Sequence, residues 1–321
     1  LVLDIVDEET PYHFEFRVTV LHEEIDYSPY ISKVYEYNPA PGQFINVMPQ
    51  YEAGENYSDI LKKVEESISG TNDVMVSLGG FGGYVVFGFD HTVINTPGEM
   101  DFMIHGNSFY ELTDNNRKGG SSEPGIVMVS YDRNCNGVPD DEWYELAGSE
   151  YHNPATLHGY SITYNRPDPD REIIMSGNLS DVNYIAWEDS EGVKGFMPKN
   201  SFHRQEYFPA WVDADQLTFS GSRLPSNGVD ASGTGAYYIL YCYDWGYADN
   251  HPNEYADLNS FDISWAVDKD GMPVVLPGVD FVKVYTGVNQ YCGWIGETST
   301  EICRAQDLHI ISADQSIPDP L

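Results

Sequence analysis

The feature that most constrains the fold of this chain is a long series of short strand-like segments separated by turn residues. Examples are "VMVSL", "GYVVFGF", "GIVMVSYD", "AYYILYCYDW" and "VDFVKVYTG", with Gly, Pro, Asn or Asp between them about every 8–12 residues. This pattern is typical of a sandwich or jelly roll. We therefore expect an all-β protein, a jelly-roll-like β-sandwich with long loops and a few short helices. No fixed-period repeat occurs, which argues against a propeller or a solenoid.

Helical periodicity is scarce, and its best example is "NYSDILKKVEESISG" at residues 56–70. Ile60, Leu61 and Val64 place apolar side chains at helical spacing. We expect Ser58 to cap the start of this helix and Gly70 to end it.

The charge of the chain argues against two classes of partner. There are 51 acidic and 16 basic residues, a formal net charge of -35. Such a field repels nucleic acid and anionic lipid surfaces, so we expect neither as a partner. No segment approaches the ~20 consecutive apolar residues of a membrane-spanning helix. With 41% hydrophobic and 14% aromatic residues, the chain is nevertheless that of a folded protein.

The first residues differ from the rest of the chain. The sequence opens in strand-like alternation, without an initiator Met or a recognisable signal peptide, so we expect a processed chain from which a targeting segment has been removed. "TPYHFEFRVTVL" alternates like the last strand of a small sandwich, and an irregular, Pro- and Tyr-rich stretch comes after it. We therefore predict a domain remnant at residues 1–22 and the main module at 23–321.

Four cysteines allow three connectivities if all are paired. Cys292 and Cys303 are the plausible pair, because they would close the short loop "CGWIGETSTEIC". Cys135 lies in a polar loop and is expected to be free. Four reduced thiols are the alternative.

The strongest local motif is the loop "DRNCNGVPD" at residues 132–140. It matches the pattern D-x-[DN]-x-[DN]-G-x-x-D, and hard cations such as Ca²⁺ take six to eight oxygen ligands. The expected ligands are four side chains and one backbone carbonyl, from Asp132, Asn134, Asn136, Asp140 and Val138 respectively.

The flanks of this loop decide which kind of calcium loop it would be. Trp143 stands where an EF-hand needs an acidic residue, and the flanking segments are strand-like. We therefore expect a β-hairpin loop that holds one structural Ca²⁺. The alternative is a hairpin of Asx-turns without a metal. The similar "VDKDGMPV", at Asp268 and Asp270, is expected to be an ordinary Asp-Gly hairpin.

No motif of the sequence demands catalysis. Neither G-x-S-x-G nor H-E-x-x-H occurs, and the nine histidines are scattered. With 51 acidic residues, a pair of carboxylates is not informative about glycoside hydrolysis. We therefore predict no catalytic residue.

Aromatic side chains among Asp, Asn and Gln form the remaining signal. Aromatic faces stack on sugars and other flat ligands, while amides and carboxylates orient hydroxyl groups. The predicted ligand-binding residues are Trp211, Trp245, Tyr247, Tyr291 and Trp294. Trp245, Tyr247 and Trp294 are expected to be exposed, because they lie in Gly-rich irregular stretches, and Trp265 and Tyr285 to lie in the core. The alternative is that half or more of these rings are core residues.

Several long motifs resemble one group of bacterial proteins. They include "SLGGFGGYVVFGFDHTVINTPGEMDFMIHGNSF", "SSEPGIVMVSYDRNCNGVPDDEWYELAGSEY" and "DWGYADN". Over roughly residues 23–312 the chain looks like the cell-surface lipoproteins of Bacteroides-type bacteria, often described as PKD-domain-containing cell-surface proteins. Cys135 stands where this group more often has Gly.

The resemblance implies a β-sandwich module preceded by an immunoglobulin-like PKD domain, whose last strand would be residues 1–22. It also implies an N-terminal lipid anchor outside this chain and a location on the extracellular face of the outer membrane. Related proteins are found beside TonB-dependent receptors, including cobalamin-uptake loci, which implies such a receptor as a partner.

Together these observations predict a non-catalytic surface protein that captures a nutrient, a glycan or a corrinoid such as vitamin B12, for a TonB-dependent transporter. The alternatives are a secreted carbohydrate-active hydrolase, which needs two opposed carboxylates in a groove, and a purely adhesive or structural protein. The adhesive protein would have no concave site lined by aromatic rings.

Overall fold

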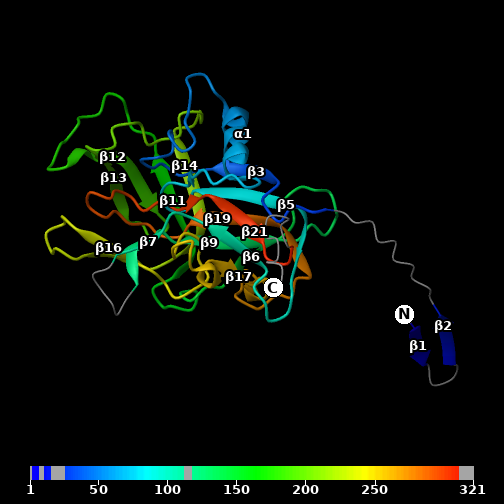
Figure 1. The fold of residues 1–321 in the computed structure, drawn as a ribbon. Coiled ribbons are helices and arrows are strands. Elements are labelled where there is room, and N and C mark those ends of the chain that lie inside the picture. The colour runs from blue at the N-terminus through cyan, green and yellow to red at the C-terminus, as the bar shows by residue number, and fades with distance from the viewer. Residues whose placement is uncertain (1, 7–10, 16–25, 112–117, 311–321) are drawn as a thin grey trace, which may run out of the picture.

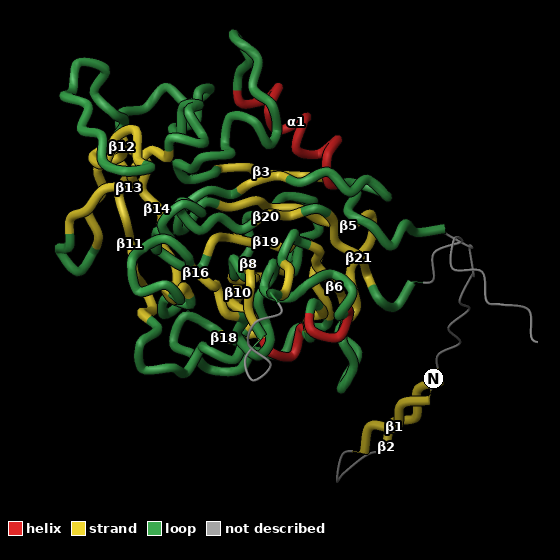
Figure 2. Tube along the Cα trace, turned by 60° about the vertical axis from the view of Figure 1, so that its left-hand side comes forward, coloured by secondary structure: helices red, strands yellow, loops and turns green. Residues whose placement is uncertain are grey.

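The structure is a computed structural model that describes residues 2–6, 11–15, 26–111 and 118–310. It is mostly β, with 38% strand and 6% helix, which confirms the expected all-β class. Figures 1 and 2 show the strands from β3 (Lys33–Asn38) onward gathered in one body with long loops, and α1 (Tyr57–Ile68) on its outside. Within the described residues, no helix is both long and apolar enough to cross a membrane.

The centre of the fold is a six-stranded antiparallel sheet with the strand order β18-β10-β9-β19-β5-β3. Alternate residues of its strands point to opposite faces, so Val127 and Val282 belong to one core cluster while Ile126 and Tyr285 belong to another. Both faces are therefore buried. In chain order, its strands are β3 (Lys33–Asn38), β5 (Tyr84–Ile94), β9 (Gly125–Ser130), β10 (Trp143–Leu146), β18 (Ala266–Val267) and β19 (Gly278–Thr286).

Different elements cover the two faces of this central sheet. The first face shares a core with α1 and with two small sheets, and the second face shares its core with a four-stranded sheet. The small sheets consist of β6 (Phe102–His105), β17 (Ser260–Phe261) and β21 (Arg304–Asp307), and of β4 (Val76–Ser77) and β20 (Glu301–Ile302). The four-stranded sheet consists of β11 (Leu157–Asn165), β12 (Leu179–Asp189), β13 (Lys194–Asn200) and β14 (Gln216–Arg223).

A second four-stranded sheet and two short 3-10 helices complete the main body. The helices cover Ala256–Leu258 and Ile263–Trp265. The sheet consists of β7 (Phe109–Tyr110), β8 (Gly119–Ser121), β15 (Gly228–Asp230) and β16 (Tyr238–Tyr241).

The expected jelly roll is not what the strands build. The sheets have a four-bladed, propeller-like arrangement rather than the two facing layers of a jelly roll. They contain unequal numbers of strands, so they leave no fixed-period repeat in the sequence. Alternation of apolar residues determines which face a side chain occupies, but it does not determine which strands pair. Here β9 pairs with β19, which comes from much later in the chain.

Within residues 1–22, the structure describes β1 (Val2–Val6) and β2 (Pro11–Glu15), which pair as an antiparallel hairpin. The remainder of this segment lies outside the described residues. Assignment of residues 1–22 to a preceding immunoglobulin-like domain stays a prediction, as does the boundary before residue 23.

The predicted disulfide between Cys292 and Cys303 is wrong, because both side chains are free thiols. Cys292 lies in a turn closed by the bridge between Tyr291 and Glu297, and the backbone N–H of Cys292 donates to the carbonyl of Gly296. The Cys303 thiol instead donates to the Gly106 carbonyl. Nearness in the sequence does not determine where a side chain points. Burial raises the pKa of Cys292 to about 11 and that of Cys303 to about 12.

The helix α1 forms at the predicted place, but its cap differs from the expected one. The side chain of Asn56 accepts a hydrogen bond from the backbone N–H of Ser58, and the Asp59 carboxylate accepts one from the N–H of Asn56. This is a capping box, with Asn56 rather than Ser58 at the cap. Ser69 is the C-cap residue. Gly70 follows it with a φ of 63°, as expected for the residue just past the C-cap of a helix.

Replacement of the two residues distinguishes the observed cap from the predicted one. Asn56→Ala should lower the free energy of unfolding by about 1 kcal/mol, because it leaves helix N–H groups without an acceptor. Ser58→Ala should change it by less than about 0.5 kcal/mol. Urea unfolding followed by circular dichroism measures both. An equal loss in the two variants would contradict the assignment.

Candidate functional site

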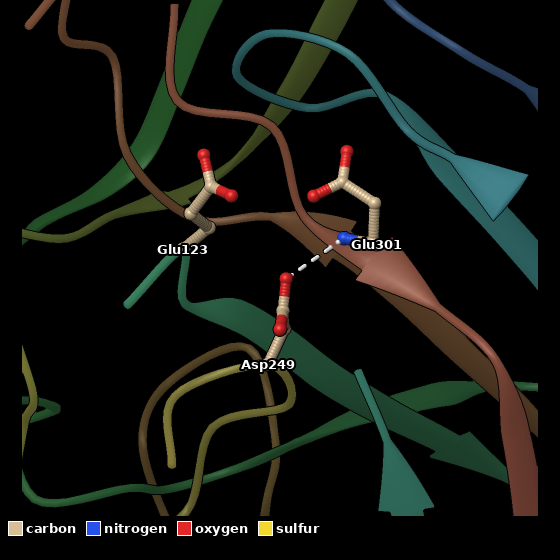
Figure 3. Close-up of side chains that lie close together, drawn as sticks. All are labelled: Glu123, Asp249 and Glu301. Carbon is tan, nitrogen blue, oxygen red and sulfur yellow. Dashed lines mark hydrogen bonds between the residues drawn. The ribbon is translucent and has the colours of Figure 1, made fainter. Parts of the chain in front are cut away.

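Three buried carboxyl groups that the sequence did not single out line one cavity, and a fourth, that of Asp249, adjoins two of them. Glu123 lies between β8 and β9, Asp249 comes after β16, Glu297 lies before β20 and Glu301 is the first residue of β20. Each exposes 8% of its surface or less. Oxygen atoms of Glu123, Asp249 and Glu301 all lie within 4.8 Å of one another (Figure 3).

Asp249 holds the segments of this cluster together. Its Oδ1 accepts the backbone N–H groups of Asn107 (2.7 Å) and Ser108 (2.9 Å), and its Oδ2 accepts that of Glu301 (2.9 Å). Its backbone has a φ of 51°, which is rare for a residue with a side chain. Gly106 makes this close approach possible, because a Cβ there would lie 2.2 Å from Oδ1. Asp249 thus joins three separate parts of the chain.

Hydrogen bonds also position the carboxyl groups of Glu301 and Glu123. Glu301 lies opposite Ser77 in the pairing of β20 with β4, and its Oε1 accepts the Ser77 hydroxyl at 2.9 Å. Glu123 Oε1 accepts the backbone N–H of Ser299 at 3.2 Å. These bonds hold both groups at the wall of the cavity, whose lining residues include Glu123, Ser299 and Glu301.

Only one of the two carboxyl oxygens of Glu297 accepts a hydrogen bond from the described residues. Its Oε1 accepts the backbone N–H of Gln43 at 2.5 Å. Its Oε2 and the side-chain oxygen of Gln43 are buried and have no hydrogen-bond partner among the described residues. Both residues line the same cavity. Buried polar atoms without a partner cost free energy, so two of them in one cavity indicate a place for a ligand group.

The cavity itself has a volume of about 670 Å³. Its exposed rings, Phe109, Tyr237 and Trp294, surround the acidic interior, and Tyr237 donates a hydrogen bond to Glu111. Among the described residues that line it, none is Lys or Arg. Cavities of about 300–1,000 Å³ with apolar walls and a few polar groups are typical of small-ligand sites.

Burial raises the pKa of all four carboxyl groups. That of Glu297 rises to about 8 and that of Glu301 to about 7. The pKa values of Glu123 and Asp249 also lie well above the ordinary range, first because of burial and then because of the negative charge of Glu301. The cluster therefore carries protons near neutral pH unless a cation replaces them.

Such a cluster could hold a metal ion, since Glu123, Asp249 and Glu301 each offer one oxygen. Asp249 is the weakest of the three as a ligand. Its Oδ1 already accepts two N–H groups and its Oδ2 one. A carboxylate oxygen has two lone pairs, so one remains available on Asp249.

The larger cavity beside β12 and β13 is a weaker candidate. It measures about 1160 Å³ and is lined by basic side chains, but these already have partners. Arg171 pairs with Asp181 at 2.8 Å, and Lys199 pairs with Glu206 at 2.9 Å. The cavity at Glu297 holds buried polar atoms that lack such partners, and we therefore take it as the candidate site.

The structure separates the five aromatic residues that were predicted to bind ligand. Trp294 is half exposed and lines the acidic cavity, and together with Tyr291 it also lines an adjoining cavity of about 480 Å³. Trp245 is exposed at another place, where its ring contacts Trp265.

The other two predicted residues are buried or partly buried. Tyr247 is 2% exposed and belongs to a core cluster, so its predicted exposure is wrong. Its hydroxyl accepts the N–H of Glu150 inside the fold. Trp211 packs against the core, with its ring 6.1 Å from that of Tyr37. Of the two rings expected in the core, Tyr285 is buried, and Trp265 is partly buried against the core.

The loop at residues 132–140 lies between β9 and β10, which pair as the expected antiparallel hairpin. Asp132 accepts the N–H groups of Asn136 and Gly137, at 3.1 and 2.7 Å. Asn134 accepts that of Asn136, and the Asn136 amide donates to Asp140. Oxygens of Asp132 and Asn134 thus converge on the N–H of Asn136, and the carbonyl of Val138 accepts the N–H of Asp140. A bound Ca²⁺ stays a prediction.

Cys135 and Asp268 each adopt a geometry that is typical of tight turns. Cys135 has a φ of 55°, a left-handed conformation that favours Gly. In the second loop, Asp268 Oδ1 accepts the N–H groups of Asp270 and Met272, both at 2.9 Å. This is the ordinary turn that we predicted.

Comparison with known proteins adds no assignment to this geometry. No protein-family model matches the chain, and no curated protein matches it.

The raised pKa values predict how stability depends on pH. Glu297 keeps its proton in the folded state up to about pH 8, whereas its ordinary pKa is 4.5. Between these values the folded state binds more protons than the unfolded state, so the free energy of unfolding falls as pH rises. Glu297→Gln should remove this part of the fall. Relative to the unmodified protein, the free energy of unfolding of this variant should gain about 4 kcal/mol between pH 5 and pH 9.

Urea unfolding at several pH values measures this difference. Glu172→Gln, at an exposed position outside the cavity, is the matched control and should leave the pH dependence unchanged. Parallel curves for Glu297→Gln and the unmodified protein would contradict the prediction.

Proposed function

We propose that this protein is a non-catalytic binding protein that captures a nutrient in the acidic cavity. The observation that carries the proposal is the combination in one cavity of about 670 Å³ of exposed aromatic rings, such as Trp294, with the buried and partly unpartnered groups of Gln43 and Glu297. Rings stack on flat ligands, and buried carboxyl and amide groups orient polar ligand atoms. A purely adhesive protein has no need of such a site.

Between the two nutrient classes, the volume favours a glycan. A cavity of this size encloses a ligand of a few rings. A corrinoid, with its macrocycle and nucleotide tail, is larger, so that only a projecting part of it would enter. The capture site would therefore hold one end of a glycan chain, with further sugars over Trp294 and the adjoining cavity lined by Tyr291.

The cellular setting is proposed on the resemblance of the sequence motifs alone. The protein would be held by a lipid anchor outside this chain, on the extracellular face of the outer membrane. It would pass its ligand to a TonB-dependent receptor.

A structural Ca²⁺ in the 132–140 loop completes the proposal. The converging oxygens of Asp132, Asn134 and Asp140 support it, because a cation could replace the N–H and amide groups that they now bind. Bound only by the folded state, the ion would stabilise the β9–β10 hairpin by mass action.

The calcium proposal predicts a specific loss of stabilisation. In excess Ca²⁺ the unmodified protein should be more stable than in chelator by about 2–3 kcal/mol, if the ion is present at 100 times its Kd. The double variant Asp132→Ala/Asp140→Ala should show no such difference. Asp268→Ala removes a similar set of turn hydrogen bonds and should retain the full effect of Ca²⁺. Thermal unfolding with and without Ca²⁺ tests this, and equal Ca²⁺ responses in the double variant and the unmodified protein would refute it.

The capture proposal predicts saturable binding that depends on Trp294. Calorimetric titration with a panel of glycans, and with cyanocobalamin in parallel, should find one class that binds. Trp294→Ala should weaken that binding about tenfold, because a stacked ring is lost. Trp245→Ala also removes an exposed Trp ring, but one outside this cavity, and should have no effect. Equal effects of the two variants would exclude the cavity as the capture site.

A secreted hydrolase is the second candidate, and one observation favours it. Glycoside hydrolysis needs one protonated carboxyl group near neutral pH beside a second carboxylate, and burial provides raised pKa values at Glu297 and Glu301. Release of reducing sugar from a bound glycan, lost in Glu297→Gln, would establish the hydrolase and exclude the non-catalytic protein.

A further inference from the structure

The acidic cavity combines a surplus of carboxyl groups with a lack of basic ones. We propose that it recognises its ligand through a protonated amine, an ammonium group held by Glu123, Glu297 and Glu301. The inference rests on the proposed capture function and names its ligand class: glycans that carry a free amino group.

The charge of the cavity lining favours a cationic ligand. Glu111, Glu123, Glu297 and Glu301 line the cavity, and none of its described lining residues is Lys or Arg. The one histidine of the described lining, His203, is held neutral because burial lowers its pKa. Carboxylates buried without a cation are costly. A cationic ligand group would supply the missing charge.

The number of hydrogen-bond acceptors in the cavity favours an ammonium group over a hydroxyl group. An ammonium group has three donors and no acceptor, whereas a hydroxyl group has one donor. Glu297 Oε2 and the side-chain oxygen of Gln43 are buried acceptors without a partner among the described residues, and they lie in the same cavity as Glu123 and Glu301. One ammonium group can therefore donate to several carboxyl oxygens that lie close together. Oxygens of Glu123 and Glu301 lie within 4.8 Å of each other.

The aromatic walls of the cavity favour a ligand that is both cationic and a sugar. Five rings line the cavity, from Phe44, Phe109, Tyr237, Tyr238 and Trp294. Aromatic faces attract cations and also stack on sugar rings. An amino sugar offers both a cation and a ring face, so the carboxyl groups and the aromatic walls would act on one ligand.

A bare metal ion accounts for fewer of these features. It would occupy a small part of a cavity of about 670 Å³ and would not use the aromatic walls. Among the three carboxylates that could hold it, Asp249 already accepts hydrogen bonds from three backbone N–H groups. An organic ammonium ligand uses Glu297, Glu123, Glu301 and the rings together.

Proton competition gives this recognition a pH signature. Glu297 and Glu301 hold protons near neutral pH because they are buried. The other titratable groups of the lining are Glu111, Glu123, His203, Tyr237 and Tyr238, and Asp249 adjoins the cluster. An ammonium group binds the ionised carboxylates, so its binding should release protons, and its affinity should fall as pH decreases from about 7 to 5.

The test uses three β-1,4-linked trisaccharides that differ only at carbon 2 of each ring. The glucosamine trisaccharide carries ammonium groups, the N-acetylglucosamine trisaccharide carries neutral amides and cellotriose carries hydroxyl groups. In calorimetric titrations at pH 7, the glucosamine trisaccharide should bind at least tenfold more tightly than the other two. Repetition in buffers of different ionisation heat should reveal proton release for this ligand alone.

Two variants connect the preference to the cavity. Glu297→Gln and Glu301→Gln keep the side-chain shape but remove a charge, and each should weaken glucosamine trisaccharide binding about tenfold to a hundredfold. Binding of cellotriose, which offers no charge to these groups, should weaken less than binding of the glucosamine trisaccharide. Glu172→Gln, an exposed acid outside the cavity, is the control and should change neither. Thermal unfolding verifies that each variant is folded.

The outcomes separate this inference from the capture function on which it rests. Equal binding of all three trisaccharides, or binding of neutral glycans alone, overturns the ammonium preference and leaves capture intact. Failure of every glycan and of cyanocobalamin to bind overturns both. Ca²⁺ binding by the Asp132→Ala/Asp140→Ala variant that disappears on adding Glu301→Gln would make the cluster a metal site and overturn the inference.

Discussion

The architecture of the site depends on one carboxylate that accepts three backbone N–H groups. Asp249 holds residues 107 and 108, after β6, beside Glu301 at the start of β20. It does so in a left-handed backbone conformation, against a glycine that leaves room for its oxygen. The contact thus joins two segments from distant parts of the sequence beside the cavity. A strained residue that the surrounding structure fixes in place is frequent at functional sites.

The same contact brings acidic side chains close together in the protein interior, where their negative charges are costly. Once Asp249 and Glu301 are brought together, Glu123 and Glu297 lie near them and away from water. Such a group of acids persists because hydrogen bonds satisfy most of its oxygens and because its members can hold protons. The buried oxygens without a hydrogen-bond partner among the described residues belong to Glu297 and Gln43, and both residues line the cavity. In our proposal, three of these four carboxyl groups also recognise the ligand, and Asp249 holds the surrounding backbone in place.

The acidic loop and the acidic cavity have different physical characters. The loop at residues 132–140 is exposed and local, and its oxygens bind N–H groups only a few residues away. The cavity cluster is buried and assembled from distant segments. The first can be read as a motif because its geometry depends on spacing and on Gly137 at a φ of 71°. The second leaves no motif.

What the sequence determined by itself was local. Alternation predicted strands on either side of residues 132–140, the loop motif predicted the turn at Gly137, and apolar residues at helical spacing predicted the helix at residues 56–70. These features depend on neighbours along the chain. Polar residues in strand-like stretches, such as Glu301 in "TSTEI", were the available signal for buried acids, but 51 acidic residues obscured it.

The tertiary structure decided the rest. It determined which strands pair, that Cys292 and Cys303 remain apart, and that Tyr247 is buried while Trp294 is exposed. It also brought Glu123, Glu297 and Glu301 to one cavity, with Asp249 beside them. These properties depend on contacts between residues far apart in the chain. Side-chain periodicity specifies the face that a residue occupies but not the partner that it meets there.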